Sequence, residues 1–262
     1  MSGLEFYNLS HVWGHEMPEW PSAPGVRVNR IQFHANHGHS VHEIDAIMHR
    51  GTHMDAPVHV TADWPTITGY ETWRFFGTGV AVSIPKGRWG VITPDDLEAA
   101  EPRIQPHDIV MINTGSHRLF GDNDDYFNYS PGLYDAAARW LVERQVKLVG
   151  MGVQAMDHPL GTKLVEHGPG PSHPHLIEEY RREFGHEPAE DFPLWEPAHK
   201  ILMGNGIPGI ENIGGDLDAV TGRRCTFAAF PWRWTEGDGC GVRVVAIVDP
   251  DGSYRISQDD ST

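Results

Sequence analysis

The segment from residue 49 to residue 59, His-Arg-Gly-Thr-His-Met-Asp-Ala-Pro-Val-His, constrains the fold of this chain more than any other stretch. Its histidines and its aspartate stand at odd positions, so an extended backbone would turn all of them to one side. At about 3.3 Å per residue the segment would span about 33 Å, whereas the ligands of one metal ion lie about 2.0–2.2 Å from it. The backbone must therefore curl if these side chains bind metal together. The side chains concerned are His49, His53, Asp55 and His59.

A helix is the alternative for this segment, because it would bring His49 and His53 together at positions i and i+4. The zinc-protease helix with that spacing has a glutamate between its histidines, and no glutamate stands there in this chain. Gly51, Thr52 and Pro57 favour a curled loop, with the glycine and the proline as bend points. On spacing alone, a histidine-rich loop without a metal also remains open.

The composition of the chain limits the kinds of molecule that it is expected to bind. The chain has 262 residues with 36 Asp plus Glu against 20 Lys plus Arg, and such an acidic balance disfavours binding to nucleic acid or to anionic membrane surfaces. No run of about 18 apolar residues and no signal-peptide pattern is present, so we expect a cytoplasmic protein without membrane spans. The 17 histidines agree with metal chemistry but do not establish it.

Short β-prone runs bounded by Gly, Pro or Asp alternate with helix signals, which indicates the α/β class. We predict strands over residues 79–84, 108–112, 146–150 and 242–248. Thr93 followed by Pro94 predicts the start of one helix, and Ser130 followed by Pro131 predicts the start of another.

No repeat or long linker divides the chain, so we predict one domain over residues 1–262. Residues 158–197 differ in being rich in Gly, Pro and His, and they predict either a lid or interface insertion or a plain surface excursion. Cys225 and Cys240 match no redox pair or thiolate zinc site, and we interpret them as free thiols.

The segment 49–59 resembles the His-x-Gly-Thr-His-x-Asp-x-Pro-x-His signature of the cyclase family of metal-dependent hydrolases, which includes bacterial kynurenine formamidases and isatin hydrolase. Every fixed position of the signature is present. The resemblance continues, more weakly, at residues 9–11, 17–21, 150–157 and 237–243, in the same order along the chain. It implies a swivelling β/β/α domain that assembles into homo-oligomers, either dimers or tetramers.

The resemblance also implies roles for individual residues. His49, His53 and Asp55 would ligate a first metal, and His59 would serve as a second-metal ligand or as the catalytic general base. The family's distant His and Glu, twelve residues apart, match a further pair here, and its N-terminal aromatic residues contribute to the substrate pocket. These additional residues are His199 and Glu211 for the second metal, and Trp13 and Trp20 for the substrate.

Two imidazoles and a carboxylate suit zinc or manganese, with one or two ions per chain, and Asp55 would bridge two ions. An open position on such a metal activates water and polarises a carbonyl. We therefore expect hydrolysis of a carbon–nitrogen bond in a small amide, lactam or formamide. The alternatives are a lactone or ester hydrolase using the same site and a metal-binding protein without catalysis.

Two departures from the family leave the substrate open: Gly152 stands where kynurenine formamidases typically have Asp, and residues 158–197 form a longer segment than theirs. Outside the signature, a cluster of histidines is a weaker candidate, expected at most to line the pocket. It comprises His34, His37, His39 and His42. No Gly-x-Ser-x-Gly elbow is present, so serine-hydrolase chemistry lacks a nucleophile.

Overall fold

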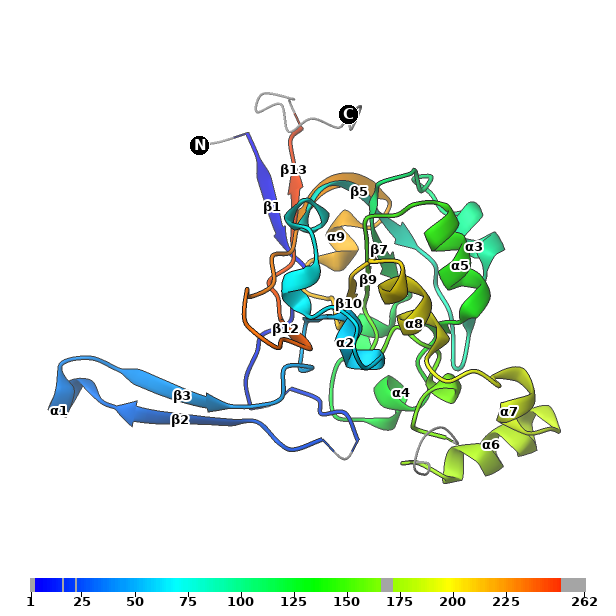
Figure 1. Ribbon diagram of the computed structural model, residues 1–262, viewed down its shortest axis with the longest axis horizontal. Helices are drawn as coiled ribbons and strands as arrows, with labels where there is room; N and C mark the ends of the chain where they lie inside the picture. The colour runs from blue at the N-terminus through cyan, green and yellow to red at the C-terminus, as the bar shows by residue number, and fades with distance from the viewer. Residues whose placement is uncertain (1–2, 16, 22, 166–171, 251–262) are drawn as a thin grey trace.

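The computed structural model describes residues 3–15, 17–21, 23–165 and 172–250. Within them, a nine-stranded mixed sheet runs through the body of the molecule (Figure 1). In their order across the sheet, its strands are β1 (Glu5–Asn8), β13 (Val245–Val248), β11 (Arg223–Ala228), β5 (Phe76–Ser83), β7 (Ile109–Asn113), β9 (Leu148–Met151), β10 (Gly209–Glu211), β4 (His53–Asp55) and β12 (Gly239–Gly241).

The centre of the sheet is parallel, from β5 through β7 and β9 to β10. Its strands are almost wholly buried, as expected where both faces of a parallel sheet are covered. Val80 and Val82 pack into one apolar layer, and Ala81 between them packs into the layer on the opposite face. The predicted strands are confirmed, although the last one is limited to β13 because Val242 bonds to the turn before β4 instead.

Helices cover both faces of this centre. The face of the sheet that carries Val80 and Val82 packs against α3 (Pro94–Glu98), α5 (Asp135–Glu143) and α8 (Pro197–Gly204). The opposite face packs against α9 (Leu217–Val220). The predicted start of α3 is confirmed, since Thr93 forms a capping box with Asp96. The α/β class predicted from the alternation of elements is therefore confirmed.

The helix start predicted at Ser130 and Pro131 is wrong. The next residues form β8 (Gly132–Leu133), which pairs with β6 (Val91–Ile92), and α5 begins only at Asp135. The Leu133 N–H donates to Met156 O at 2.8 Å, so a bond between distant segments holds the backbone extended there. The pairing of β8 with distant segments therefore outweighs the local helix signal at Ser130 and Pro131.

A hairpin projects from the body as a long arm (Figure 1). It consists of β2 (Arg27–Gln32), α1 (His34–His37) and β3 (Val41–Asp45), and neither strand has a buried residue. The histidine cluster of residues 34–42 lies here, not in the pocket described below.

The described part of residues 158–197 is ordered and helical. It contains η4 (Pro159–Gly161), α6 (His175–Phe184) and α7 (Pro188–Asp191), which pack around Trp89 in a small core of their own. Residues 166–171 lie outside the described residues.

The other short elements are α2 (Pro57–Val60), α4 (Asp124–Phe127), η1 (Ile67–Gly69), η2 (Thr72–Phe75) and η3 (Ser116–Leu119). Among the described residues, no helix is both long and apolar enough to cross a membrane.

Candidate metal centre

The segment 49–59 curls as its sequence predicts. Gly51 adopts the left-handed backbone conformation, with φ at +61°, and a Cβ there would lie 2.6 Å from Met17 Sδ. Pro57 opens the short helix α2 at its first position, where its missing N–H costs little. Between these bends, the buried strand β4 carries His53 and Asp55 on one face.

Sheet pairing brings the distant glutamate to this strand. β4 lies between β10 and β12, antiparallel to both, and its register places Glu211 directly opposite His53. His199 approaches from α8, where its Nε2 lies 2.9 Å from Glu211 Oε1 and 3.4 Å from Asp55 Oδ2. His199 and Glu211, which the family's spacing of twelve residues predicted as a pair, therefore both lie beside the segment 49–59.

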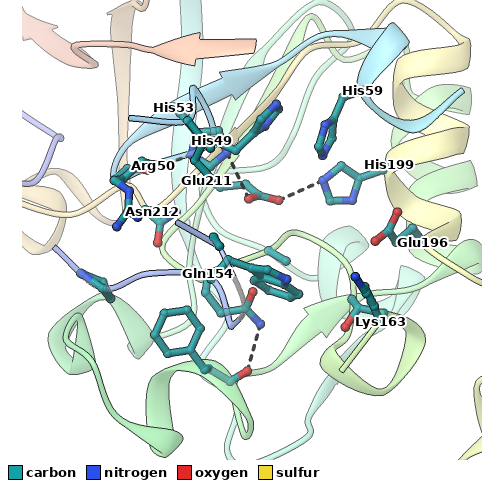
Figure 2. Close-up of a pocket in the computed structure, with 18 of the residues that line it drawn as sticks. His49, Arg50, His53, His59, Gln154, Lys163, Glu196, His199, Glu211 and Asn212 are labelled. Atoms are coloured by element: carbon teal, nitrogen blue, oxygen red, sulfur yellow. Dashed lines mark hydrogen bonds and ion pairs between the residues drawn. The ribbon is translucent and has the colours of Figure 1, made fainter. Parts of the chain in front are cut away.

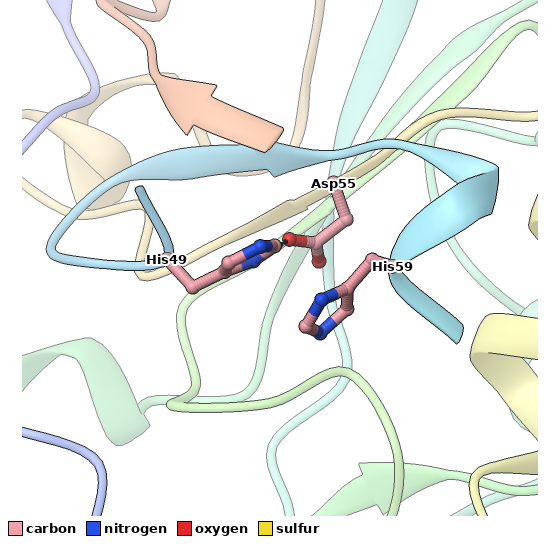
Figure 3. Close-up of side chains that lie close together, drawn as sticks. All are labelled: His49, Asp55 and His59. Atoms are coloured by element: carbon pink, nitrogen blue, oxygen red, sulfur yellow. Dashed lines mark hydrogen bonds and ion pairs between the residues drawn. The ribbon is translucent and has the colours of Figure 1, made fainter. Parts of the chain in front are cut away.

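The nitrogen and oxygen atoms converge in two groups that share Asp55. One group is His49, Asp55 and His59, and the other is His53, Asp55 and Glu211; within each group the ligand atoms lie within 4.8 Å of one another. Figure 3 shows His49 and His59 on either side of the Asp55 carboxylate. The geometry thus puts His49 and His53 in separate groups, with Asp55 between two cation positions.

Two aspartates that the sequence analysis missed hold these histidines in place. Asp157 accepts a 2.6 Å hydrogen bond from His199 Nδ1 and bonds to the first N–H groups of α8, including that of His199 itself at 3.0 Å. Asp238 accepts a bond from His49 Nε2 at 3.0 Å. Such outer partners fix the orientation and raise the basicity of a ligating imidazole. Both aspartates lie in segments that resembled the family, but no spacing rule linked them to a histidine.

The carboxylates control the charge of the cluster. Burial alone lowers the pKa of His49, but its hydrogen bonds to Asp238 and Asp55 outweigh burial and raise that pKa to about 10. Burial opposes ionisation of Asp55 as well, yet His53 and the other nearby imidazoles hold its pKa well below the usual range. The cluster is therefore built around a carboxylate that stays negative and needs positive charge beside it.

His59 differs from the other imidazoles. It stacks on His49 with ring centroids 3.7 Å apart and keeps one edge exposed toward the pocket. Protein packed around its ring lowers the pKa of His59 to about 4, and repulsion from His49 and His199 adds to this effect. His59 is therefore neutral near pH 7 and able to accept a proton.

The residues fit a divalent cation. Asp55 Oδ2 is buried, and its ion-pair partner His199 Nε2 lies 3.4 Å away without forming a hydrogen bond. A metal cation beside this oxygen would offset the cost of burying it. The surrounding donors are imidazole nitrogens and carboxylate oxygens, the mixture that zinc and manganese accept. His53 Nδ1 donates to Gly51 O at 2.8 Å, which leaves its Nε2 available as a ligand atom.

A pocket of about 260 Å³ adjoins the cluster (Figure 2). One side, which we call the histidine wall, is formed by His49, His53, His59, His199 and Glu211. Another side, the loop wall, comes from the segment 158–197 and is formed by Thr162, Lys163, Trp195 and Glu196.

Of the two predicted substrate-binding tryptophans, Trp20 lines this pocket. Trp13 instead lines a second cavity of about 650 Å³ near the base of the arm. Gly152, where the family's formamidases typically carry Asp, is tightly enclosed: a Cβ there would lie 2.9 Å from the Cβ of His117 and 3.0 Å from Ile213 O. A larger residue at position 152 would require its neighbours to shift.

Comparisons with known proteins agree with this geometry. The family model described as "Putative cyclase" matches residues 7–158. Cyclase-like protein 1 of Arabidopsis thaliana is 23% identical over 159 residues, which cover 57% of this chain and 61% of that protein. Kynurenine formamidase of Bacillus mycoides is 22% identical over 246 residues, covering 94% of this chain and 98% of that protein.

Solved structures share the fold over nearly the whole chain. Isatin hydrolase A from Labrenzia aggregata, bound to benzyl benzoate, has a TM-score of 0.72 at 22% identity, with 94% of each chain covered. An isatin hydrolase bound to the product analogue thioisatinate has a TM-score of 0.73 at 20% identity, covering 94% of this chain and 93% of that one.

Proposed function

This chain belongs to the Cyclase family, and we propose from that premise that it is a metal-dependent hydrolase of a carbon–nitrogen bond in a small amide, lactam or formamide. One observation carries the proposal: a buried set of imidazoles and carboxylates opens onto a pocket of about 260 Å³ beside the neutral, exposed His59. A metal site with a purely structural role would be closed by protein ligands, whereas this one adjoins space for a substrate.

We assign the ligand atoms to His49, His53, Asp55, His199 and Glu211, with His49 at one position, His53 and Glu211 at the other, and Asp55 shared by both. When bound, a divalent ion in such a site polarises a carbonyl and lowers the pKa of water. Zinc and manganese both suit these donors. Asp55 faces both positions, which supports its role as a bridge between two ions.

His59 is our candidate for the general base. Its low pKa keeps the imidazole neutral, so it can take a proton from the attacking water and then pass that proton to the leaving nitrogen. Asp157 and Asp238 keep His199 and His49 oriented during this exchange. Trp20 and Trp195 add aromatic surface to the lining of the pocket.

Activity is tested by incubating the zinc- or manganese-loaded protein with N-formylkynurenine, isatin, small lactams and small lactones. We expect turnover of at least one carbon–nitrogen substrate, lost on chelation and restored by metal. Turnover of lactones alone would replace the proposal by the ester-hydrolase alternative, and no turnover with a filled metal site would favour a binding protein.

Metal stoichiometry is tested separately. We expect the saturated native chain to bind two ions and Glu211→Ala to bind one, as measured by elemental analysis and by anomalous diffraction at the metal edge. A single ion per saturated native chain would contradict the two-metal assignment and give Glu211 another role.

We further propose that the protein is a homo-oligomer. The arm supports this, because a two-stranded ribbon is marginally stable alone in water and this one exposes Ile31, Phe33 and Ile44. Ile44 also lines the second cavity beside Trp13, which places part of this exposed apolar surface next to a cavity. Light scattering of the native protein and of a variant with a shortened arm should show loss of the oligomer in the variant.

A cytoplasmic location is our proposal as well. It is supported by Cys225 and Cys240, which are both buried and unpaired, as is usual where thiols stay reduced.

A further inference from the structure

Lys163 is the residue of the pocket that the proposed chemistry leaves unused. Its side chain is half-buried and lines the pocket, and Figure 2 shows it at the end away from His49 and His53, beyond Glu196. Among the described residues, its ammonium forms no hydrogen bond and no ion pair. A positive charge in a partly enclosed pocket, with no counter-ion among the described residues, is a site for an anion.

The pocket is also lined by Arg50, whose guanidinium forms an ion pair although its Nε and Nη1 have no hydrogen-bond partner. Arg50 Nη1 lies 3.0 Å from Glu19 Oε1, and its Nη2 donates to Pro24 O at 2.7 Å. Arg50 therefore fastens the N-terminal segment that carries Trp20 over the pocket. Of the two Lys and Arg side chains that line the pocket, Lys163 is the one with no ion pair to a described residue.

The backbone around Lys163 is fixed on both sides. Thr162 Oγ1 donates to Pro159 O at 2.7 Å, and Lys163 O accepts from the N–H of Ser172 at 2.9 Å. The Glu196 N–H donates to Gly161 O at 2.8 Å, which ties the two parts of the loop wall together. The backbone of Lys163 itself is thus held by a hydrogen bond to a described residue.

The charges around the pocket indicate a role for Lys163. The chain carries a net charge of −16, and Glu196 lines the pocket on the loop wall, whereas the proposed metal ions would offset Asp55 and Glu211. An anionic substrate would be repelled by this field unless a cation received its charged group, whereas a neutral amide would need no such cation.

We propose that Lys163 forms an anion-binding subsite, and that the natural substrate is a small amide carrying a carboxylate on the side away from the scissile bond. This inference rests on the proposed amide hydrolysis and adds the substrate class to it. Lys163 binds and orients the substrate without taking part in the proton transfers.

The test compares formanilide with 2-, 3- and 4-formamidobenzoate, which add a carboxylate to the same ring and keep the same formyl group. We expect the native enzyme to favour one of the three acids over formanilide at least tenfold in kcat/KM, mainly through KM. Lys163→Met should reduce that ratio at least tenfold, and Lys163→Arg should keep it. Lys86→Met, which removes a lysine paired with Asp96 outside the pocket, controls for net charge.

An equal ratio in native enzyme and Lys163→Met, or a native preference for formanilide, would overturn the subsite. If none of these formyl groups is cleaved, the proposed function fails for formamides, and the subsite is then judged by binding. In that case calorimetry on the metal-loaded protein compares benzoate with benzamide. Stronger benzoate binding that is lost in Lys163→Met supports the subsite, and equal benzoate binding in native and variant protein refutes it.

Discussion

On the histidine wall the imidazoles are held by protein oxygens, with His53 bonded to Gly51 and His199 bonded to Asp157, whereas Lys163 on the loop wall has no partner among the described residues. The first wall is built into the sheet through β4 and β10, and the second is carried by the helical segment 158–197. The contrast teaches that the protein itself fixes the side chains of the first wall, whereas the lysine of the second has no ion pair to a described residue. Substitutions on the histidine wall should therefore cost more activity.

The largest effect is expected from His53→Ala. Losing a buried imidazole ligand should remove most bound metal, and with it several kcal/mol of transition-state stabilisation, or ~10³-fold in rate. Metal content by elemental analysis and kcat/KM are the measurements, with His39→Ala on the exposed arm as the matched control. Full metal and full turnover in His53→Ala would remove the distinction between the walls.

His59→Gln separates chemistry from coordination on the same wall. If His59 serves mainly as the base, kcat should fall by about 10²-fold or more while the metal held by the other ligands stays bound. Metal analysis beside steady-state kinetics checks this. Simultaneous loss of the metal would show that His59 is a ligand first.

Asp157→Asn tests how strongly the histidine wall depends on the hydrogen bond from His199 Nδ1 to Asp157. The amide keeps the shape but accepts the bond from His199 less strongly, so metal affinity or activity should fall by about 10–100-fold. Metal affinity from competition with a chelator is the readout, and Asp191→Asn, beside the exposed His186, is the control. An unchanged affinity would mean that the sheet alone positions His199.

The smallest effect concerns the point where the loop wall leaves the body. His158 Nε2 donates to Trp89 O at 2.9 Å, and burial lowers its pKa to about 4, below its ordinary value of 6.5. The unfolded chain therefore binds more protons between about pH 4 and 6.5, so stability falls as pH drops through that range. At pH 5 the loss should be about 2 kcal/mol relative to pH 7.5.

Urea unfolding at pH 7.5 and pH 5 measures this loss. His158→Gln should show a smaller difference between the two pH values than the native protein, whatever its absolute stability. His37→Gln, on the exposed arm, should retain the native difference. Equal pH dependence in the native protein and His158→Gln would show that other groups cause the loss.

The sequence predicted the histidine wall far better than the loop wall. The curl at Gly51 follows from ligand reach and backbone freedom, and the parallel strands follow from apolar runs, so both could be predicted from local patterns. Asp157 and Asp238 could not, because they meet His199 and His49 only after the sheet is assembled. The failed helix start at Ser130 has the same cause, since a distant partner fixes the backbone there.

The position of β4 in the sheet also has a consequence for biosynthesis. Both of its neighbours, β10 and β12, are encoded about 150 residues or more downstream, so the emerging strand has nothing to pair with for a long time. At ~5–20 residues per second, roughly 10–30 s pass between translation of the histidine-rich segment and translation of β10. During that interval the nascent chain carries its candidate metal ligands in an unpaired strand. An ion that needs both Asp55 and Glu211 would therefore be bound only after β10 has joined the sheet.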